Sequence, residues 1–160
     1  MKKITLKDIA EVTGLSIKTV SRALKDKDSI SLETRKMVQQ VAKDMGYIPN
    51  SLASSMRSGR TDSIAIILGE MVNPYNAYLM NHLTTHLHDR GYTTLMFVTN
   101  QRRSHEERAV QTAISKNVDA IISATQLRPD NLELIMNHHI PFVQIGLVSM
   151  KPAFCQVSKD

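Results

Sequence analysis

The chain has 160 residues, 42% hydrophobic and 22% charged, which is typical of a globular protein and excludes a disordered or fibrous one. No apolar run approaches the roughly 18 residues that a membrane-spanning helix needs, and no apolar stretch follows the basic start, so we expect neither a membrane segment nor a secretory signal. The single cysteine, Cys155, cannot form an internal disulfide, which fits a cytoplasmic protein.

The positive charge is concentrated at the beginning of the sequence. Residues 1–60 contain 12 Lys and Arg against 6 Asp and Glu, a net charge of +6, whereas residues 61–160 contain 8 against 9, a net charge of −1. This asymmetry predicts a head that binds a polyanion, joined to a nearly neutral body. A basic surface that only keeps the protein in solution is the alternative interpretation.

Two short helices are predicted at the start of the chain. Thr5 and Asp8 have the spacing of a capping box, and Gly14 is suited to end the helix that they begin. Ser16 then caps a second helix over residues 17–25. Two helices joined by so short a turn have the form of a helix-turn-helix.

The outer face of the second helix is polar and basic, with Lys18, Thr19, Ser21 and Arg22 available to solvent. A helix that reads the major groove of DNA requires such a face. A third helix begins after Ser31 and ends at Gly46. A three-helix bundle with a solvated face fits the same spacing, so the pattern alone leaves DNA binding open. The apolar positions at helical spacing are Leu6, Ile9, Ala10, Val12, Val20, Ala23, Leu24, Met37, Val38, Val41, Ala42 and Met45.

A break in the pattern follows the third helix. Pro49 disfavours helical backbone at Ile48, and residues 50–57 are enough for only two helical turns. A helix that short is marginal in isolation. We therefore expect a linker that orders only under some conditions.

Beyond Thr61 the chain alternates between strands and helices. The expected strands cover residues 63–68, 93–98, 120–123 and 142–145, with helices over 75–90, 104–116 and 129–138. This alternation predicts an α/β domain with a parallel sheet, in which ligands bind beyond the carboxyl ends of the strands. Those ends are residues 69–75, 99–100, 125–126 and 146–147.

Several motifs occur in one order at fixed spacing, and together they resemble the lactose-repressor/galactose-repressor (LacI/GalR) family over essentially the whole chain. In the first fifty residues they are Thr5–Ala10, Gly14–Ser16, Thr19–Leu24, Thr34–Arg35 and Gly46–Asn50. Further along they are Ser58–Thr61, Asn73–Tyr75, Gly91–Tyr92 and Val118–Ile122.

The resemblance implies a bacterial transcription regulator, in particular a repressor, that binds a near-palindromic operator in double-stranded DNA as a homodimer. It implies a helix-turn-helix headpiece over residues 1–49, a hinge helix and linker over 50–60, and a partial α/β sensor body over 61–160 that resembles a periplasmic binding protein. A small-molecule effector, expected to be a sugar, would be held between two subdomains. No catalytic residue, cofactor or metal is implied.

The resemblance also assigns roles to individual residues. The expected base readers are Ile17, Lys18 and Arg22. The expected phosphate contacts are Thr5, Ser16, Thr19, Ser21, Ser31 and Thr34. The expected minor-groove contacts in the hinge are Asn50, Ala53, Met56 and Arg57. From their places at the carboxyl ends of the strands, the expected effector contacts are Asn73, Tyr75, Asn100 and Thr125. The Tyr75 ring is expected to form an aromatic wall, and the alternative is that it only caps the sheet.

The hinge departs from the family pattern at two positions. Met56 stands where a leucine is usual, and it is an apolar wedge of suitable length for opening a base step. Ser54 stands where an arginine is usual and lacks its charge. We expect Arg57 and Arg60 to supply part of that charge.

Family members are longer than this chain, which stops near the first crossover to the second subdomain. We therefore expect a truncated sensor body that binds effector weakly or not at all and tends to self-associate. The missing returning strand should leave the residues of 64–68 and 120–123 poorly covered at a sheet edge.

Other functions receive less support from the sequence. His82 and His86 have the spacing of two metal ligands, but the sequence offers no clear third ligand, and His138–His139 suits the negative end of a helix. The turn Leu68–Met71 is not a phosphate-binding loop, and Cys155 has no evident catalytic partners. The stronger alternative is a small-molecule-binding α/β module without regulated DNA binding, although it leaves the basic head unexplained.

Overall fold

The computed structural model describes residues 4–25, 29–50, 55–56, 58–146 and 155–157. The chain divides into two compact units, Met1–Asn50 and Ser51–Asp160, which we call the head and the body. Within the described residues, no helix has the length and apolar character that would let it cross a lipid bilayer.

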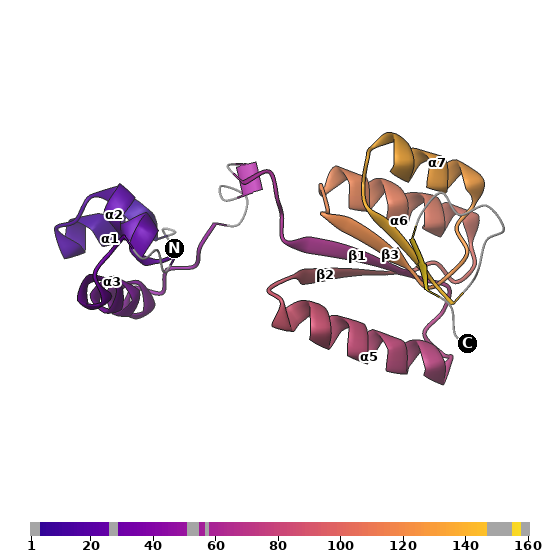
Figure 1. Ribbon diagram of the computed structural model, residues 1–160, viewed down its shortest axis with the longest axis horizontal. Coiled ribbons are helices and arrows are strands. Elements are labelled where there is room, and N and C mark those ends of the chain that lie inside the picture. Colours follow the sequence, from indigo (N-terminus) through magenta and orange to yellow (C-terminus); the bar gives the residue numbers. More distant parts are fainter. Residues whose placement is uncertain (1–3, 26–28, 51–54, 57, 147–154, 158–160) are drawn as a thin grey trace. The chain divides into compact units, whose positions relative to one another are not determined.

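The head consists of three helices, which are α1 (Leu6–Thr13), α2 (Ile17–Ala23) and α3 (Leu32–Asp44) (Figure 1). The expected capping box is confirmed, because Thr5 accepts from the Asp8 amide and Asp8 accepts from the Thr5 amide. Gly14 follows α1 with a φ of 68°, in the left-handed region that glycine occupies without strain. Helix α2 ends at Ala23, two residues earlier than the sequence predicted.

The core of the head takes buried residues from all three helices, which are Ile9, Ala10, Val20, Ala23, Val38 and Ala42. Two of the apolar positions assigned to the helical stripes are exposed instead, since Val12 is 63% and Met37 42% accessible. Met37 lies about 100° around the helix from Val38, beyond the stripe that faces the other helices. Val12 lies about 200° around α1 from the buried Ala10, and so faces solvent.

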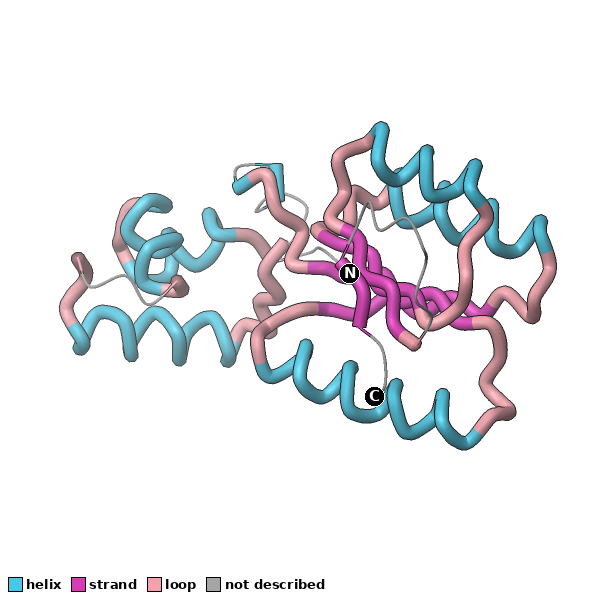
Figure 2. Tube along the Cα trace, turned by 45° about the vertical axis from the view of Figure 1, so that its right-hand side comes forward, coloured by secondary structure: helices cyan, strands magenta, loops and turns pink. Residues whose placement is uncertain are grey.

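The body contains one five-stranded sheet, in which every pair of neighbouring strands is parallel, in the order β2-β1-β3-β4-β5 (Figure 2). The strands are β1 (Ser63–Leu68), β2 (Thr93–Val98), β3 (Ala120–Ser123), β4 (Phe142–Ile145) and β5 (Cys155–Val157). The helices are α5 (Pro74–Asp89), α6 (Arg103–Ser115) and α7 (Pro129–Asn137). The α/β fold class and the four strands expected from the sequence are confirmed.

Helices cover both faces of the sheet. Ile66 and Leu68 of β1 pack with Met80 of α5 on one face. Ala65 and Ile67, which point the opposite way, pack with α6 and α7 on the other face. The continuous apolar sequence of β1 is therefore required by its position, since all six of its residues are buried.

The expectation of an exposed edge at residues 64–68 and 120–123 was wrong. Strand β1 lies between β2 and β3, and β3 lies between β1 and β4, so both are interior strands. The outer strands of the described sheet are β2 and β5. Strand β5 could not be predicted from the sequence, because three residues with a polar centre show no recognisable period.

Glu106 of α6 is a buried carboxylate, only 8% exposed, that holds the beginning of α7. Its Oε1 accepts hydrogen bonds from the backbone N–H of Arg128 and from Nδ2 of Asn131, both at 2.7 Å. Asn131 is itself buried, so its amide depends on this carboxylate for a partner.

Replacing Glu106 with alanine is expected to lower the free energy of unfolding of the body by about 1–3 kcal/mol, because two buried donors lose their acceptor. Glu106→Gln keeps an acceptor oxygen at the same place and should lose less. Denaturant unfolding of the full chain measures both. The control is Glu107→Gln, whose exposed carboxylate pairs with Arg103, and an equal loss there would contradict a special role for Glu106.

Candidate functional site

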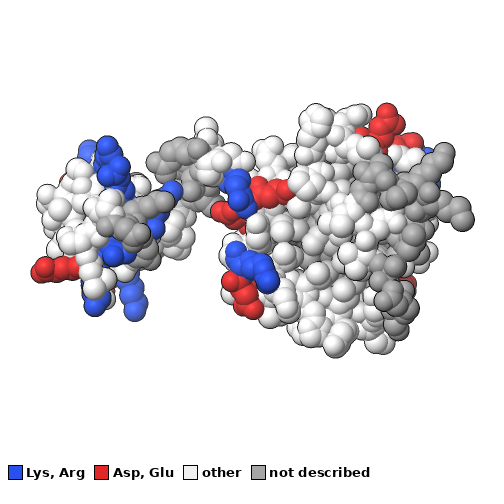
Figure 3. All heavy atoms as spheres, viewed as in Figure 1, with Lys and Arg blue, Asp and Glu red and all other residues white. Residues whose placement is uncertain are grey.

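Helix α2 presents one side to solvent and buries the other. Val20 and Ala23 lie in the head core, whereas Ile17 is 49% exposed and Lys18 and Arg22 are exposed. The three exposed residues fall within about 140° of the helix circumference. Figure 3 shows lysine and arginine side chains standing out from the visible face of the head. An exposed helix face that combines two cations with an apolar side chain is suited to base edges in a major groove.

Three of the residues expected to contact phosphate, Thr5, Ser16 and Ser31, already cap helices, whereas Ser21 lies half-buried within α2. Ser16 accepts from the Thr19 amide and its Oγ lies 2.9 Å from the Thr19 hydroxyl, and Ser31 and Thr34 repeat the arrangement at 2.8 Å. In each pair one hydroxyl group donates to the other, so the second hydroxyl proton remains available to donate to a phosphate oxygen. The donors of Thr5 are more fully used, because its amide and hydroxyl both donate to Asp8, at 2.7 and 2.6 Å.

The hinge residues are described in part. Met56 is helical and 88% exposed, and Asn50 is exposed. The predictions for Ala53 and Arg57, and the departure at Ser54, lie outside the described residues. Arg60, which was expected to supply part of the charge that Ser54 lacks, donates a hydrogen bond to the Tyr92 hydroxyl at 2.9 Å.

At the carboxyl edge of the sheet lies a cavity of about 270 Å³. Its lining consists of Gly69, Glu70, Asn73, Tyr75, Asn76, Leu79, Gln101, Ala124, Thr125, Ile145 and Gly146. The structure thus brings together three of the four expected effector contacts, Asn73, Tyr75 and Thr125. Asn100 is not among the lining residues. It and Gln101 both follow β2 with positive φ, at 49° and 58°, and this turn brings Gln101 to the cavity.

Polar contacts hold the walls of this cavity in place. Asn73 caps α5 by accepting from the Tyr75 amide at 2.9 Å, and Asn76 Nδ2 donates to the Glu70 carbonyl at 2.8 Å. Gly69 lacks a side chain where a Cβ would come within 3.3 Å of the Thr125 hydroxyl oxygen. The Thr125 loop can therefore approach β1 closely.

Buried side chains behind the cavity fix the Thr125 loop. The carbonyl of Thr125 accepts from Ser123 Oγ at 2.7 Å and from Gln144 Nε2 at 3.0 Å. Sequence reasoning missed Gln144, because nothing in a four-residue strand marks a buried amide. Gln101 could have been predicted from the sequence, since it follows the same strand as the expected contact Asn100. Amides, a hydroxyl and an exposed aromatic ring around a small cavity suit a compact ligand rich in hydroxyl groups.

The histidines do not come together as a metal site. Within the described ranges, no group of three His, Cys, Asp or Glu side chains is placed to bind a metal ion. The His82 ring instead lies 4.3 Å from the Tyr78 ring, one helical turn away on α5. His138 follows the last turn of α7, at the carboxyl end of that helix.

Comparison with known proteins agrees with this geometry. Residues 5–50 match the model of the bacterial regulatory proteins of the lacI family. The chain is 31% identical to the HTH-type transcriptional regulator DegA of Bacillus subtilis (strain 168) over 148 residues, which cover 90% of this chain and 44% of that protein. It is 29% identical to the HTH-type transcriptional repressor PurR of Pasteurella multocida (strain Pm70) over 147 residues, 91% of this chain and 43% of that one.

A solved structure extends the match through the body. A LacI-family transcriptional regulator from Silicibacter pomeroyi superposes with a TM-score of 0.79 at 28% identity, covering 97% of this chain and 47% of that one. The chain thus spans less than half the length of each of these three proteins. The family model covers the head, and the relatives continue the match through the sheet. The chain therefore belongs to the lacI family of bacterial regulatory proteins.

Proposed function

We propose that this chain is the DNA-binding and first sensor part of a transcription regulator, acting as a repressor in the cytoplasm. The observation that carries the proposal is the exposed face of α2, where Ile17, Lys18 and Arg22 project from a helix anchored by Val20 and Ala23. The concentration of positive charge in residues 1–60 and the names of the relatives support it. The proposal gives the chain no catalytic role.

In this proposal the α2 face reads base edges and the helix caps contact the backbone of the duplex. Lys18 and Arg22 donate to O6 and N7 of guanine, and Ile17 contacts a thymine methyl group. The phosphate contacts fix the register of the head without selecting a sequence. They are assigned to Ser16, Thr19, Ser21, Ser31 and Thr34, and to Thr5 once its bonds to Asp8 open.

The hinge contributes a wedge in the minor groove. An exposed methionine has the length and apolar character to enter an opened base step, and Met56 is suited to this role. Asn50, Ala53 and Arg57 are proposed to contact the groove beside it. Bending the duplex in this way lets more of the protein surface meet the DNA.

Met56→Ala is expected to weaken binding to a selected duplex roughly tenfold and to reduce its bend, since the shorter side chain cannot hold the opened step. Titration by fluorescence anisotropy gives the affinity, and the mobility of circularly permuted fragments gives the bend. Met136→Ala, which removes an exposed methionine of α7, serves as the control. A loss of affinity with the bend unchanged would show that Met56 is not a wedge.

The cavity at the carboxyl edge is proposed to hold part of a small effector, in particular a sugar. Tyr75 would stack on the ring, and Asn73 and Thr125 would hydrogen-bond to its hydroxyl groups, with Gln101 taking the place expected of Asn100. Among the described residues, the lining carries one acidic side chain, Glu70, and no lysine or arginine, which disfavours an anionic ligand.

A second copy of the chain is the proposed protein partner. Helix α5 exposes the ring of Tyr78, and the outer strand β2 exposes Met96. Exposed aromatic and methionine side chains are enriched at interfaces between proteins. A homodimer that pairs this side of the body would present two heads to two half-sites of a palindromic operator.

Selection of duplexes from a random-sequence pool by the full chain tests the proposed function. We expect enrichment of near-palindromic sites, with an affinity that falls linearly with the logarithm of the salt concentration. Failure to enrich any sequence would contradict it. In that case calorimetric binding of a sugar by the same chain would favour the small-molecule-binding module.

A further inference from the structure

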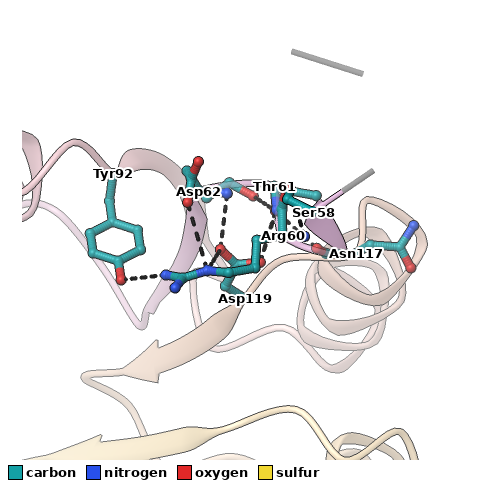
Figure 4. A network of polar contacts seen from close by, with 8 residues as sticks. Ser58, Arg60, Thr61, Asp62, Tyr92, Asn117 and Asp119 are labelled. Carbon is teal, nitrogen blue, oxygen red and sulfur yellow. Dashed lines mark hydrogen bonds and ion pairs between the residues drawn. The ribbon is translucent and has the colours of Figure 1, made fainter. Parts of the chain in front are cut away.

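The segment by which the linker joins β1 is tied down by a cluster of polar contacts at the amino edge of the sheet (Figure 4). Both carboxylate oxygens of Asp119 accept backbone hydrogen bonds, Oδ1 from the Thr61 amide at 3.0 Å and Oδ2 from the Asp62 amide at 2.9 Å. The Thr61 hydroxyl donates to the Asn117 carbonyl at 2.9 Å. Two consecutive residues of the segment are therefore bound to the chain that leads into β3.

Arg60 links the same segment to the start of β2. Its Nη2 donates to the Tyr92 hydroxyl at 2.9 Å, and its Nε lies 3.8 Å from carboxylate oxygens of both Asp119 and Asp62. The hydrogen bond with Tyr92, followed by the charges of Asp119 and Asp62, raises the pKa of Arg60 above its ordinary value. The Arg60 cation thus contacts Tyr92, which directly precedes β2, and Asp119, which directly precedes β3.

Polar bonds, rather than packing, hold this segment. A cavity of about 700 Å³ lies at the amino edge, lined by Arg60, Tyr92 and Asp119 together with apolar residues such as Ile64 and Ile140. The Arg60 side chain remains 58% exposed beside it. Since little apolar surface covers the segment, loss of the hydrogen bonds would leave its backbone free to move away from the sheet.

We propose that Asp119 and Tyr92 are positioning residues that fix the direction in which the linker leaves the body. We call this contact set, Arg60–Asp62 held by Tyr92 and Asp119, the linker clamp. The inference rests on the proposed function, because the linker carries the DNA-reading head. A fixed exit in both copies of a dimer would restrict the separation of the two heads, and so the half-site spacing that the dimer accepts.

The clamp differs in its consequences from a direct role of Arg60 at a phosphate group. A lost phosphate contact would reduce the slope of affinity against salt by about one unit. Tyr92→Phe removes only a hydroxyl from the clamp and leaves every charge in place. It should therefore leave the salt slope unchanged and alter only the order of the segment and the spacing preference.

The experiment compares the wild-type chain with Tyr92→Phe and Asp119→Asn, with Asp130→Asn as the matched control, because Asp130 also pairs with an arginine on the surface of the body. Amide hydrogen exchange at Thr61 and Asp62 reports the clamp without DNA. Titration of a selected duplex, and of the same duplex with one base pair inserted at its centre, reports the spacing preference. Thermal unfolding checks that the body of each variant remains folded.

We expect Asp119→Asn, which keeps only one acceptor oxygen, to speed exchange more than tenfold at one of the two amides of Thr61 and Asp62 and less at the other. Tyr92→Phe should speed exchange at both by a smaller factor. For the wild type and Asp130→Asn, the inserted base pair should lower the affinity for the duplex about tenfold. For the two clamp variants, the same insertion should lower the affinity less than about threefold. Unchanged exchange, or an unchanged spacing penalty in folded variants, would overturn the clamp. If the wild-type chain selects no DNA, the proposed function fails, and the exchange data alone then decide whether the clamp exists.

Discussion

Ile9→Ala is expected to destabilise the head by about 2–5 kcal/mol, because a fully buried side chain is removed from a small core, to which six buried residues contribute among those that the structure describes. A unit of this size has little stability to lose. The head should therefore be largely unfolded, and binding to DNA should disappear with it.

The body should be unaffected by this change, because the head and body are separate compact units with separate cores. Residue-resolved amide exchange measures both units in one sample. Val12→Ala, on the exposed side of the same helix, is the control and should cost less than about 0.5 kcal/mol. Equal losses of protection in β1 and α1 would contradict independent units.

Arg22→Ala is expected to cost roughly 1–3 kcal/mol in affinity for the selected duplex, because one bidentate contact to a guanine is lost. Preference at one base pair of each half-site should relax, while binding to random DNA should fall much less. Titrations of selected, singly substituted and random duplexes at one salt concentration measure these effects.

Lys43→Ala provides the comparison for Arg22, since it removes an exposed charge from the last turn of α3 and leaves α2 intact. It should weaken all duplexes alike, if it weakens any. Equal losses of Arg22→Ala on selected and random DNA would make Arg22 a phosphate contact and contradict its role as a base reader.

Most of the secondary structure could be predicted because its signals are local. The capping box at Thr5 and the left-handed Gly14 depend on residues within a few positions of each other. The continuous apolar sequence of β1 predicts a buried central strand from its composition alone. Strand β5 lacks both kinds of signal, since it exists only as a pairing with β4.

The candidate sites were less predictable where they depend on contacts between distant segments. The exposed face of α2 follows from its own sequence, and so could be assigned in advance. The linker clamp joins residues that are more than thirty positions apart in the chain, and Glu106 meets Asn131 across 25. Nothing in the local pattern around Asp119 distinguishes a clamp from an ordinary strand start, and only the sheet order brings it beside Thr61 and Asp62.

The central claim is that the outer face of α2 reads the bases of a DNA duplex. Nuclear magnetic resonance of the full chain, with and without its selected duplex, tests this claim most directly. We predict that the largest amide shifts fall on Ile17, Lys18 and Arg22, and that a random duplex of equal length shifts these residues far less. Equal shifts with both duplexes, or shifts confined to the body, would contradict the claim.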